Sequence, residues 1–310
     1  MTAAIDCALE AGLYRFGQEV LKILPDMFER GITFPVTEDD ERRFLETLNL
    51  KAIREFTYSV HDFAAEHRGK ARRKNLKLAL SMSGHDLNNL VGIFGTICSA
   101  YSNRKVVNLP EHFFRNYTNY RTLVLTMADL GLGGAPAYVT EIPVSQLEYL
   151  LYQGRINLKV TTTIPESRTI TSREYVSLYQ LVQNVPPVPE RKVSVEIEVY
   201  RNKGGSLLVV RDNGPGILDQ EDKPISAERL PEIFGEYSTK KAGGGWGLQL
   251  VKALVELPTL CRRGTEKGYV SVSTKSEGGP ASFYSTSDGI SRTLERELTP
   301  GTEFKLHFNR

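Results

Sequence analysis

The chain has 310 residues, of which 40% are hydrophobic and 25% are charged, which is ordinary for a folded globular protein. Its formal net charge of +2 is too balanced for nucleic acid or an anionic membrane surface to be a main partner. The sequence has no apolar run near the roughly 18 residues of a membrane span and no signal peptide, so we expect a cytoplasmic protein with no membrane span.

The N-terminal part of the chain shows helical spacing of its apolar residues. Residues 1–24 predict a helix that stops near Pro25, and a loop follows over residues 26–37. Residues 1–70 show no recognisable sensor fold, and we interpret them as a helical input or dimer-extending region.

Thr37 is the expected start of a second helical segment. A hydroxyl followed by four acidic residues is typical of a helix N-terminus. Helical spacing then runs with little interruption to about residue 101. After a loop over residues 102–110, a further helix over residues 111–131 ends in glycines. These two helices predict an antiparallel helical hairpin, which we assign to residues 71–135.

From residue 137 onward, short strands mix with helices. Apolar and polar residues alternate strictly over residues 193–199, and a glycine-containing turn leads to a returning strand over residues 206–212. Further strands are predicted at residues 137–142, 156–164, 269–274, 281–286 and 303–308, and helices at 145–152, at 172–185 and after 243–247. The pattern predicts an α+β layered domain over residues 137–310, so the fold class of the chain is α+β with helices first.

The turn Asp-Asn-Gly-Pro-Gly at residues 212–216 ends a strand that reads as buried. The Asp212 carboxylate can accept a hydrogen bond from an exocyclic amine such as that of adenine. Gly214 and Gly216 let the backbone approach a flat base because they carry no Cβ. Taken alone, the segment is equally consistent with a simple turn.

A second signal is the glycine cluster at residues 243–247, which follows Lys240 and opens a helix. Backbone N–H groups at the positive end of a helix suit a phosphate. The cluster lacks the Gly-Lys-Ser/Thr ending of a phosphate loop, so by itself it is weak.

Two further signals are Asn184 and Thr302. Asn184 shares a helix face with Gln180, and its side-chain carbonyl is a hard oxygen ligand that suits Mg²⁺. Gly301 and Thr302 form a turn into the last strand. Each has an ordinary structural explanation when taken by itself, as the polar end of a helix or as a turn.

In this order, the four segments resemble the GHKL superfamily. Asn184 matches its N box, residues 212–216 its G1 box, residues 243–247 its G2 box, and Thr302 its final strand, while Ile233-Phe234 resembles its F box. Over residues 137–310 the resemblance implies an α/β sandwich that binds ATP and Mg²⁺, with Asn184 as the metal ligand. It implies nucleotide contacts from Asn184, Asp212, Gly214, Gly216, Lys240, Gly243, Gly245, Gly247 and Thr302.

Gln180 bears on the type of GHKL protein. Members that hydrolyse ATP directly carry a glutamate at this position, and a glutamine cannot act as a general base. Kinase members also lack the glutamate and pass the γ-phosphate to a histidine. The resemblance therefore favours a kinase and requires a histidine in the helical hairpin.

His85 is the expected phosphate acceptor. On a helical wheel it lies opposite the apolar stripe of its helix. The sequence His-Asp-Leu-Asn-Asn resembles the phospho-acceptor box of sensor histidine kinases. The resemblance implies that His85 is the nucleophile, that Asp86 acts as a base or orients the imidazole, and that Asn89 aligns water during dephosphorylation of a partner. His61, in His-Asp-Phe, is a rival that lacks the Asn pair and lies at the edge of its apolar stripe.

The main departure from the family follows Asn184, where the sequence reads Val-Pro-Pro-Val-Pro. Proline ends the helix early and displaces the basic residue that the family usually places there. Arg191 and Lys192 are candidates to replace its phosphate contact. Trp246 stands in the G2 box where a smaller aliphatic residue is common. These departures are compatible with nucleotide binding but argue against efficient turnover.

Two functions follow from the resemblance. The first is a cytoplasmic histidine kinase that phosphorylates His85 from Mg·ATP, passes the phosphoryl group to a response-regulator receiver domain, and also acts as a phosphatase. It would be a homodimer through the helical hairpin, because one hairpin cannot bury its whole apolar stripe. The alternative is a histidine phosphotransfer or scaffold protein with a weakened or idle ATP domain. A GHKL kinase acting on serine is a third option, against which the His-Asp box argues.

Overall fold

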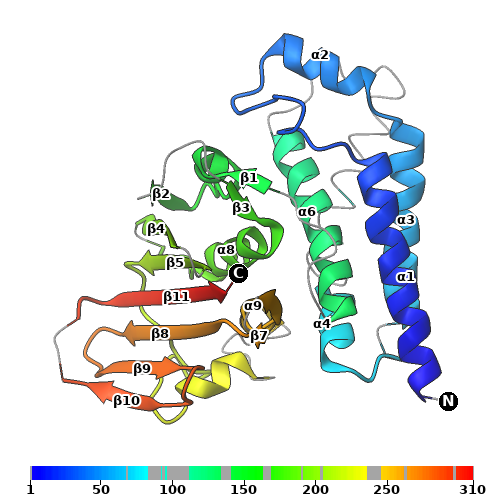
Figure 1. Cartoon of the computed structure of the whole chain (residues 1–310). Coiled ribbons are helices and arrows are strands. Elements are labelled where there is room, and N and C mark those ends of the chain that lie inside the picture. Colours follow the sequence, from blue (N-terminus) through cyan, green and yellow to red (C-terminus); the bar gives the residue numbers. More distant parts are fainter. Residues whose placement is uncertain are drawn as a thin grey trace. The chain divides into compact units, whose positions relative to one another are not determined.

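The computed structural model divides the chain into two compact units, Met1–Ile142 and Pro143–Arg310 (Figure 1). The structure describes residues 2–67, 69–82, 92, 95, 112–133, 141–162, 169–189, 191–202, 205–235, 246–261, 264–295 and 298–309. Six of the predicted site residues lie outside these ranges: His85, Asp86, Asn89, Lys240, Gly243 and Gly245.

The N-terminal unit is helical. Its helices are α1 (Thr2–Ile23), α2 (Glu38–Glu46), α3 (Leu50–His67), α4 (Lys74–Met82) and α6 (His112–Leu132). Both α1 and α4 pack on α6, which is buried over most of its length. The helices predicted over residues 1–24 and 111–131 are confirmed. Within the described parts of the chain, none of the helices has the length and apolar character needed to cross a membrane.

The prediction of nearly uninterrupted helix from Thr37 is wrong at two places. The start is correct, because the Thr37 hydroxyl accepts a hydrogen bond from the Asp40 N–H at 3.2 Å. However, α2 ends at Thr47, whose hydroxyl donates to a backbone carbonyl, and the Asn49 side chain accepts from the first turn of α3. Such side chains compete with helical backbone bonds. The second break precedes α4, where the Arg72 N–H donates to Asp6 of α1 at 3.1 Å.

The C-terminal unit is built on a seven-stranded sheet in the order β10-β9-β8-β11-β5-β4-β2 (Figure 1). Its strands are β2 (Ile156–Thr162), β4 (Val193–Asn202), β5 (Gly205–Asp212), β8 (Tyr269–Lys275), β9 (Ala281–Ser285), β10 (Ser291–Leu294) and β11 (Gly301–Asn309). The β2–β4 pair is parallel and the other pairs are antiparallel. The predicted α+β class and the β4–β5 hairpin are confirmed.

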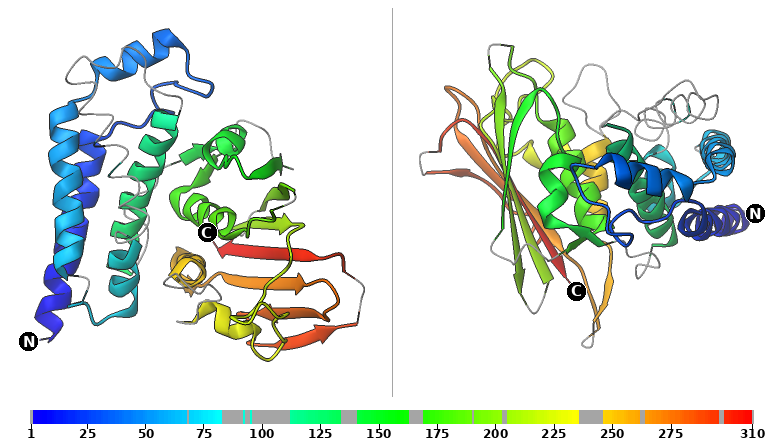
Figure 2. Two further views of the ribbon diagram at one scale, coloured as in Figure 1. Left: turned by 180° about the vertical axis from the view of Figure 1, so that it is seen from behind. Right: turned by 90° about the horizontal axis from the view of Figure 1, so that it is seen from above.

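Helices α8 (Ser172–Asn184) and α9 (Trp246–Val255) pack on one another and cover one face of this sheet (Figure 2, right). The alternation of β4 accounts for the layering, since Val195, Ile197 and Val199 are fully buried. Shorter elements complete the unit: η2 (Val144–Gln146), α7 (Leu147–Leu150), η3 (Leu230–Phe234), the pair β1 (Glu141–Pro143) and β3 (Thr169–Thr171), and the pair β6 (Thr259–Cys261) and β7 (Gly264–Glu266). The sequence did not predict β3, β6, β7 or β10.

A buried glutamate fixes α8 to the β4–β5 hairpin. Glu174 forms a capping box with Thr171, which precedes the helix. Its carboxylate also lies 3.4 Å from the guanidinium of Arg201 in β4 and accepts from the hydroxyl of Ser206 in β5. Because a buried carboxylate needs such partners, these bonds hold α8 in place on the sheet. Asn184, at the other end of α8, is positioned by the same attachment.

Candidate functional site

Asp212 lies at the end of β5, between two neighbouring strands of the sheet. It is paired with Val195 of β4 and Thr302 of β11 in the strand register. Its carboxylate accepts a hydrogen bond from the Gly214 N–H at 2.8 Å and another from the Thr302 backbone. Burial nevertheless raises the pKa of Asp212 to about 6, despite these hydrogen bonds. A further donor from a ligand would stabilise its charged form.

The turn after Asp212 also forms a hydrogen bond to β8. The Ile217 N–H donates to the Thr274 hydroxyl at 2.9 Å, and the hydroxyls of Thr274 and Thr302 are 3.4 Å apart. Gly216 has a φ of 78°, and a Cβ at this position would lie 2.5 Å from the backbone oxygen of Lys275. Only glycine fits here, as the predicted close approach of the backbone requires.

Asn184, Gln180 and Gly247 come together where α8 meets α9. A Cβ on Gly247 would lie 2.7 Å from the Asn184 amide nitrogen and 3.0 Å from the Gln180 side-chain oxygen. The first turn of α9 therefore rests directly on the polar face of α8. Pro186, which follows α8, lies next to the Asp212 turn. Its ring is 3.8 Å from the position that a Cβ on Gly214 would take.

We expect Gly247→Ala to displace the Asn184 side chain, because the new methyl group would overlap it. The two neighbouring atoms are ends of flexible side chains, so the thermal stability should change little. Affinity for Mg·ATP should fall by about tenfold, or about 1.4 kcal/mol, in a calorimetric titration. The matched control is Gly154→Ala, whose Cβ would have its nearest neighbour 4.0 Å away. Equal affinities for the two variants would contradict the placement of Asn184 in the site.

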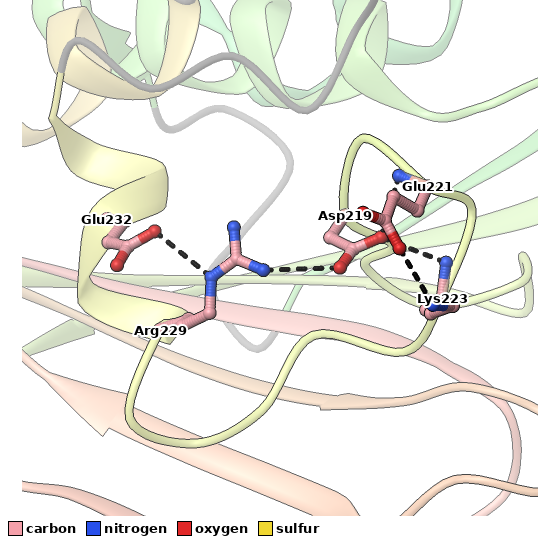
Figure 3. Close-up of polar contacts among 5 residues, drawn as sticks. All are labelled: Asp219, Glu221, Lys223, Arg229 and Glu232. Carbon is pink, nitrogen blue, oxygen red and sulfur yellow. Dashed lines mark hydrogen bonds and ion pairs between the residues drawn. The ribbon is translucent and has the colours of Figure 1, made fainter.

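A compact loop connects the Asp212 turn to η3 (Figure 3). Asp219 accepts hydrogen bonds from the backbone N–H groups of Glu221 and Lys223 at 2.8 and 3.0 Å. The hydrogen bond from Lys223, followed by that from Glu221, holds the pKa of Asp219 below its usual value. Arg229 lies between the carboxylates of Asp219 and Glu232, at 3.2 and 3.4 Å. The sequence did not reveal this cluster, in which Arg229 reaches Asp219 from 10 residues away.

The F-box residues at the end of η3 are buried. Ile233 and Phe234 are 2% and 4% exposed, and the Phe234 ring lies 5.9 Å from that of Tyr284. The carbonyl of the next residue, Gly235, accepts a hydrogen bond from the Gln249 side chain in α9. Residues 235 and 246, on either side of the segment that contains Lys240, Gly243 and Gly245, are therefore held on neighbouring elements.

Residues 177–309 match the family described as Histidine kinase-, DNA gyrase B-, and HSP90-like ATPase. This segment makes up most of the C-terminal unit, so the match concerns that unit alone. The predicted resemblance to the GHKL superfamily is thus confirmed for the part of the chain that carries Asn184, Asp212 and Thr302.

Three solved structures illustrate what the chain is similar to. They are a mycobacterial sensor histidine kinase, MprB (18% identity, TM-score 0.34, 56% of this chain and 96% of that chain), the catalytic domain of histidine kinase ThkA (18%, 0.35, 56% and 95%), and histidine kinase AdeS of Acinetobacter baumannii (14%, 0.32, 73% and 97%). No curated protein matches the sequence. At such identities and TM-scores, the assignment depends on the family match and on the residues of the site.

Proposed function

We propose that this chain is a two-component histidine kinase that phosphorylates His85 from Mg·ATP and passes the phosphoryl group to an aspartate of a receiver domain. The observation that carries the proposal is that the side chains of Asn184 and Gln180 lie together beside Gly247, in the first turn of α9. Gln180 is 5% exposed and cannot take a proton from water, so this ATPase-family site lacks the base for direct hydrolysis. The γ-phosphate needs another acceptor, and His85 is our candidate.

The described residues fit a bound Mg·ATP. The partly buried Asp212 carboxylate accepts hydrogen bonds from the backbones of Gly214 and Thr302. A carboxylate can accept further hydrogen bonds, and the adenine amine would supply one. The Asn184 side-chain oxygen would hold Mg²⁺, which stabilises the negative charge of the phosphates. Gly214 and Gly216 place no Cβ at their two positions of the turn, while Lys240, Gly243 and Gly245 remain proposed phosphate contacts.

The proposal assigns the acceptor residues their roles in the helical hairpin. The His85 imidazole would form a nitrogen–phosphorus bond as the bond from the γ-phosphorus to ADP breaks. Asp86 would orient the ring, and Asn89 would align water when the enzyme acts as a phosphatase. These three residues are assigned from the sequence alone.

The test is incubation of the purified protein with γ-labelled ATP and Mg²⁺. We expect label on the protein that is lost in acid and retained in alkali, as a phosphoramidate requires. Transfer of the label to a receiver domain would extend the proposal to the partner. If ATP binds in a calorimetric titration and no label appears, the alternative is preferred, in which His85 relays phosphate and the ATP domain is idle.

The homodimer remains a proposal, and α1 offers a surface for it. One face of α6 is covered by α1 of the same chain, so this face is not available to a second copy. Tyr14 and Leu21 are each 46% exposed and lie one heptad apart on α1, and the exposed Cys7 lies one heptad earlier. We therefore propose that residues 1–70 extend the dimer of the hairpin at 71–135.

If α1 pairs in parallel with its copy, mild oxidation should give a disulfide-linked dimer through Cys7. The two Cα atoms must lie within about 4.4–6.8 Å for this bond to form. The measurement is non-reducing electrophoresis beside light scattering, with Cys7→Ser as the control. A dimer in light scattering without the cross-link would contradict parallel pairing of α1 at Cys7.

A further inference from the structure

Arg191 contacts the turn that carries Asp212, and it does so from the proline-rich segment after α8. Its guanidinium donates to the Asn213 side-chain oxygen at 2.9 Å and to the Asn213 backbone oxygen at 2.6 Å. Asn213 directly follows Asp212, so a two-point contact on this residue restrains the peptide next to the nucleotide-binding carboxylate.

The same turn is also attached to the start of β4. The Ser194 N–H donates to the Asn213 side-chain oxygen at 2.8 Å, and the Asn213 N–H donates to the Ser194 backbone oxygen at 3.1 Å. Every one of these bonds involves Asn213, which accepts two of them through a single side-chain oxygen. The Arg191 contact therefore completes a network whose centre is one residue from Asp212.

The prolines after Asn184 explain how Arg191 reaches this position. Val185 caps α8, and Pro186 lies beside Gly214. The chain then turns tightly, with the Arg191 N–H donating to the Val188 carbonyl at 3.3 Å. Proline fixes φ and ends the helix, so the segment crosses the turn instead of continuing α8. The departure from the family pattern thus builds a connection between the helix of Asn184 and the turn of Asp212.

We propose that Arg191 is a positioning residue that holds the Asp212 turn in its adenine-binding conformation, and that it does not contact phosphate. The inference rests on the proposed ATP binding, and it concerns binding alone. A failure of phosphoryl transfer to His85 therefore leaves it testable. Arg191 and Asn213 are both exposed, so their bonds contribute little to folding and act mainly on the geometry of the turn.

The test compares adenosine, ADP and ATP in calorimetric titrations. We expect Arg191→Ala to weaken all three by the same factor, about fivefold to tenfold, as the loss of one or two modest hydrogen bonds predicts. Asn213→Ala should give at least the same loss, because its side-chain oxygen accepts from both Arg191 and Ser194. The double variant should lose less than the sum of the two single losses, because the two variants share the contact between Arg191 and Asn213. The melting temperature of each variant should stay near that of the parent.

Two further variants separate position from charge. Lys159→Ala removes a cation of β2 that is 65% exposed beside Glu196 and should leave all three affinities unchanged. Arg191→Lys keeps the charge but cannot make the planar two-point contact, so it should behave like Arg191→Ala. A loss for ATP that exceeds the loss for adenosine would mean that Arg191 contacts phosphate, and would overturn the inference. An unchanged affinity in Arg191→Ala, or full rescue by lysine, would overturn it as well.

Discussion

Replacing His85 with glutamine should abolish the acid-labile labelling of the protein by γ-labelled ATP. Glutamine is polar and of similar length, but its amide nitrogen is not a nucleophile, so no nitrogen–phosphorus bond can form. ATP binding should remain at the level of the parent, since the residues that we propose to bind the nucleotide lie in the C-terminal unit. We expect at least a hundredfold loss of label with an unchanged Kd for ATP.

His61 provides the matched control for this experiment. It lies on α3 next to Asp62, with 3.3 Å between its Nδ1 and the carboxylate, so it shares the His-Asp pair without the following Asn pair. As expected from the wheel, its neighbours Val60 and Ala64 are buried while its own side chain is 34% exposed. His61→Gln should leave labelling intact. Loss of label in that variant and retention in His85→Gln would reverse the assignment of the acceptor.

Local patterns predicted most of the sheet and the turn at residues 212–216. The alternation in β4 is a direct consequence of one buried face, and the Asp212 turn needs glycines because its backbone touches β8. Thr37 was a correct helix start because capping acts within one turn. In each case the deciding interaction is local or periodic, so the sequence displays it.

The features that the sequence did not reveal depend on contacts between distant residues. The break before α4 is stabilised by Asp6, which lies 66 residues earlier than Arg72. Arg191 was a candidate for a phosphate contact, and its bonds to Asn213 become visible only when the chain folds back over 22 residues. Strand β10 is four residues long and is defined by its pairing with β9, for which its own residues give little signal.

Replacing Asp212 with asparagine should abolish nucleotide binding. In our proposal the carboxylate accepts a hydrogen bond from the adenine amine, whereas the asparagine can place an N–H group against that amine. Loss of a charged acceptor and creation of an unpaired donor correspond to about 3 kcal/mol, or more than about a hundredfold in Kd. The measurement is a calorimetric ATP titration, and normal ATP binding would show that the pocket is wrongly assigned.

The same substitution should stabilise the free protein at neutral pH, because Asp212 is a carboxyl group whose folded pKa lies above its unfolded value. The pKa rises from 3.8 to about 6 on folding, so between these values the folded state binds the extra proton. Stability therefore falls as the pH rises through this window and then remains constant. A shift of this size corresponds to roughly 3 kcal/mol, and the neutral amide should recover about 1 to 2 kcal/mol of it.

Trp246 is the single tryptophan of the chain and opens α9, so its fluorescence reports unfolding of the unit that contains Asp212. We expect Asp212→Asn to melt several degrees above the parent at pH 7 to 8, and the two curves to converge near pH 4, where the aspartate is protonated. A difference that is independent of pH would mean that the gain comes from packing. A variant that binds no ATP yet melts higher would show that burial of the Asp212 carboxylate destabilises the fold. It would also show that the charge of this carboxylate serves ligand binding.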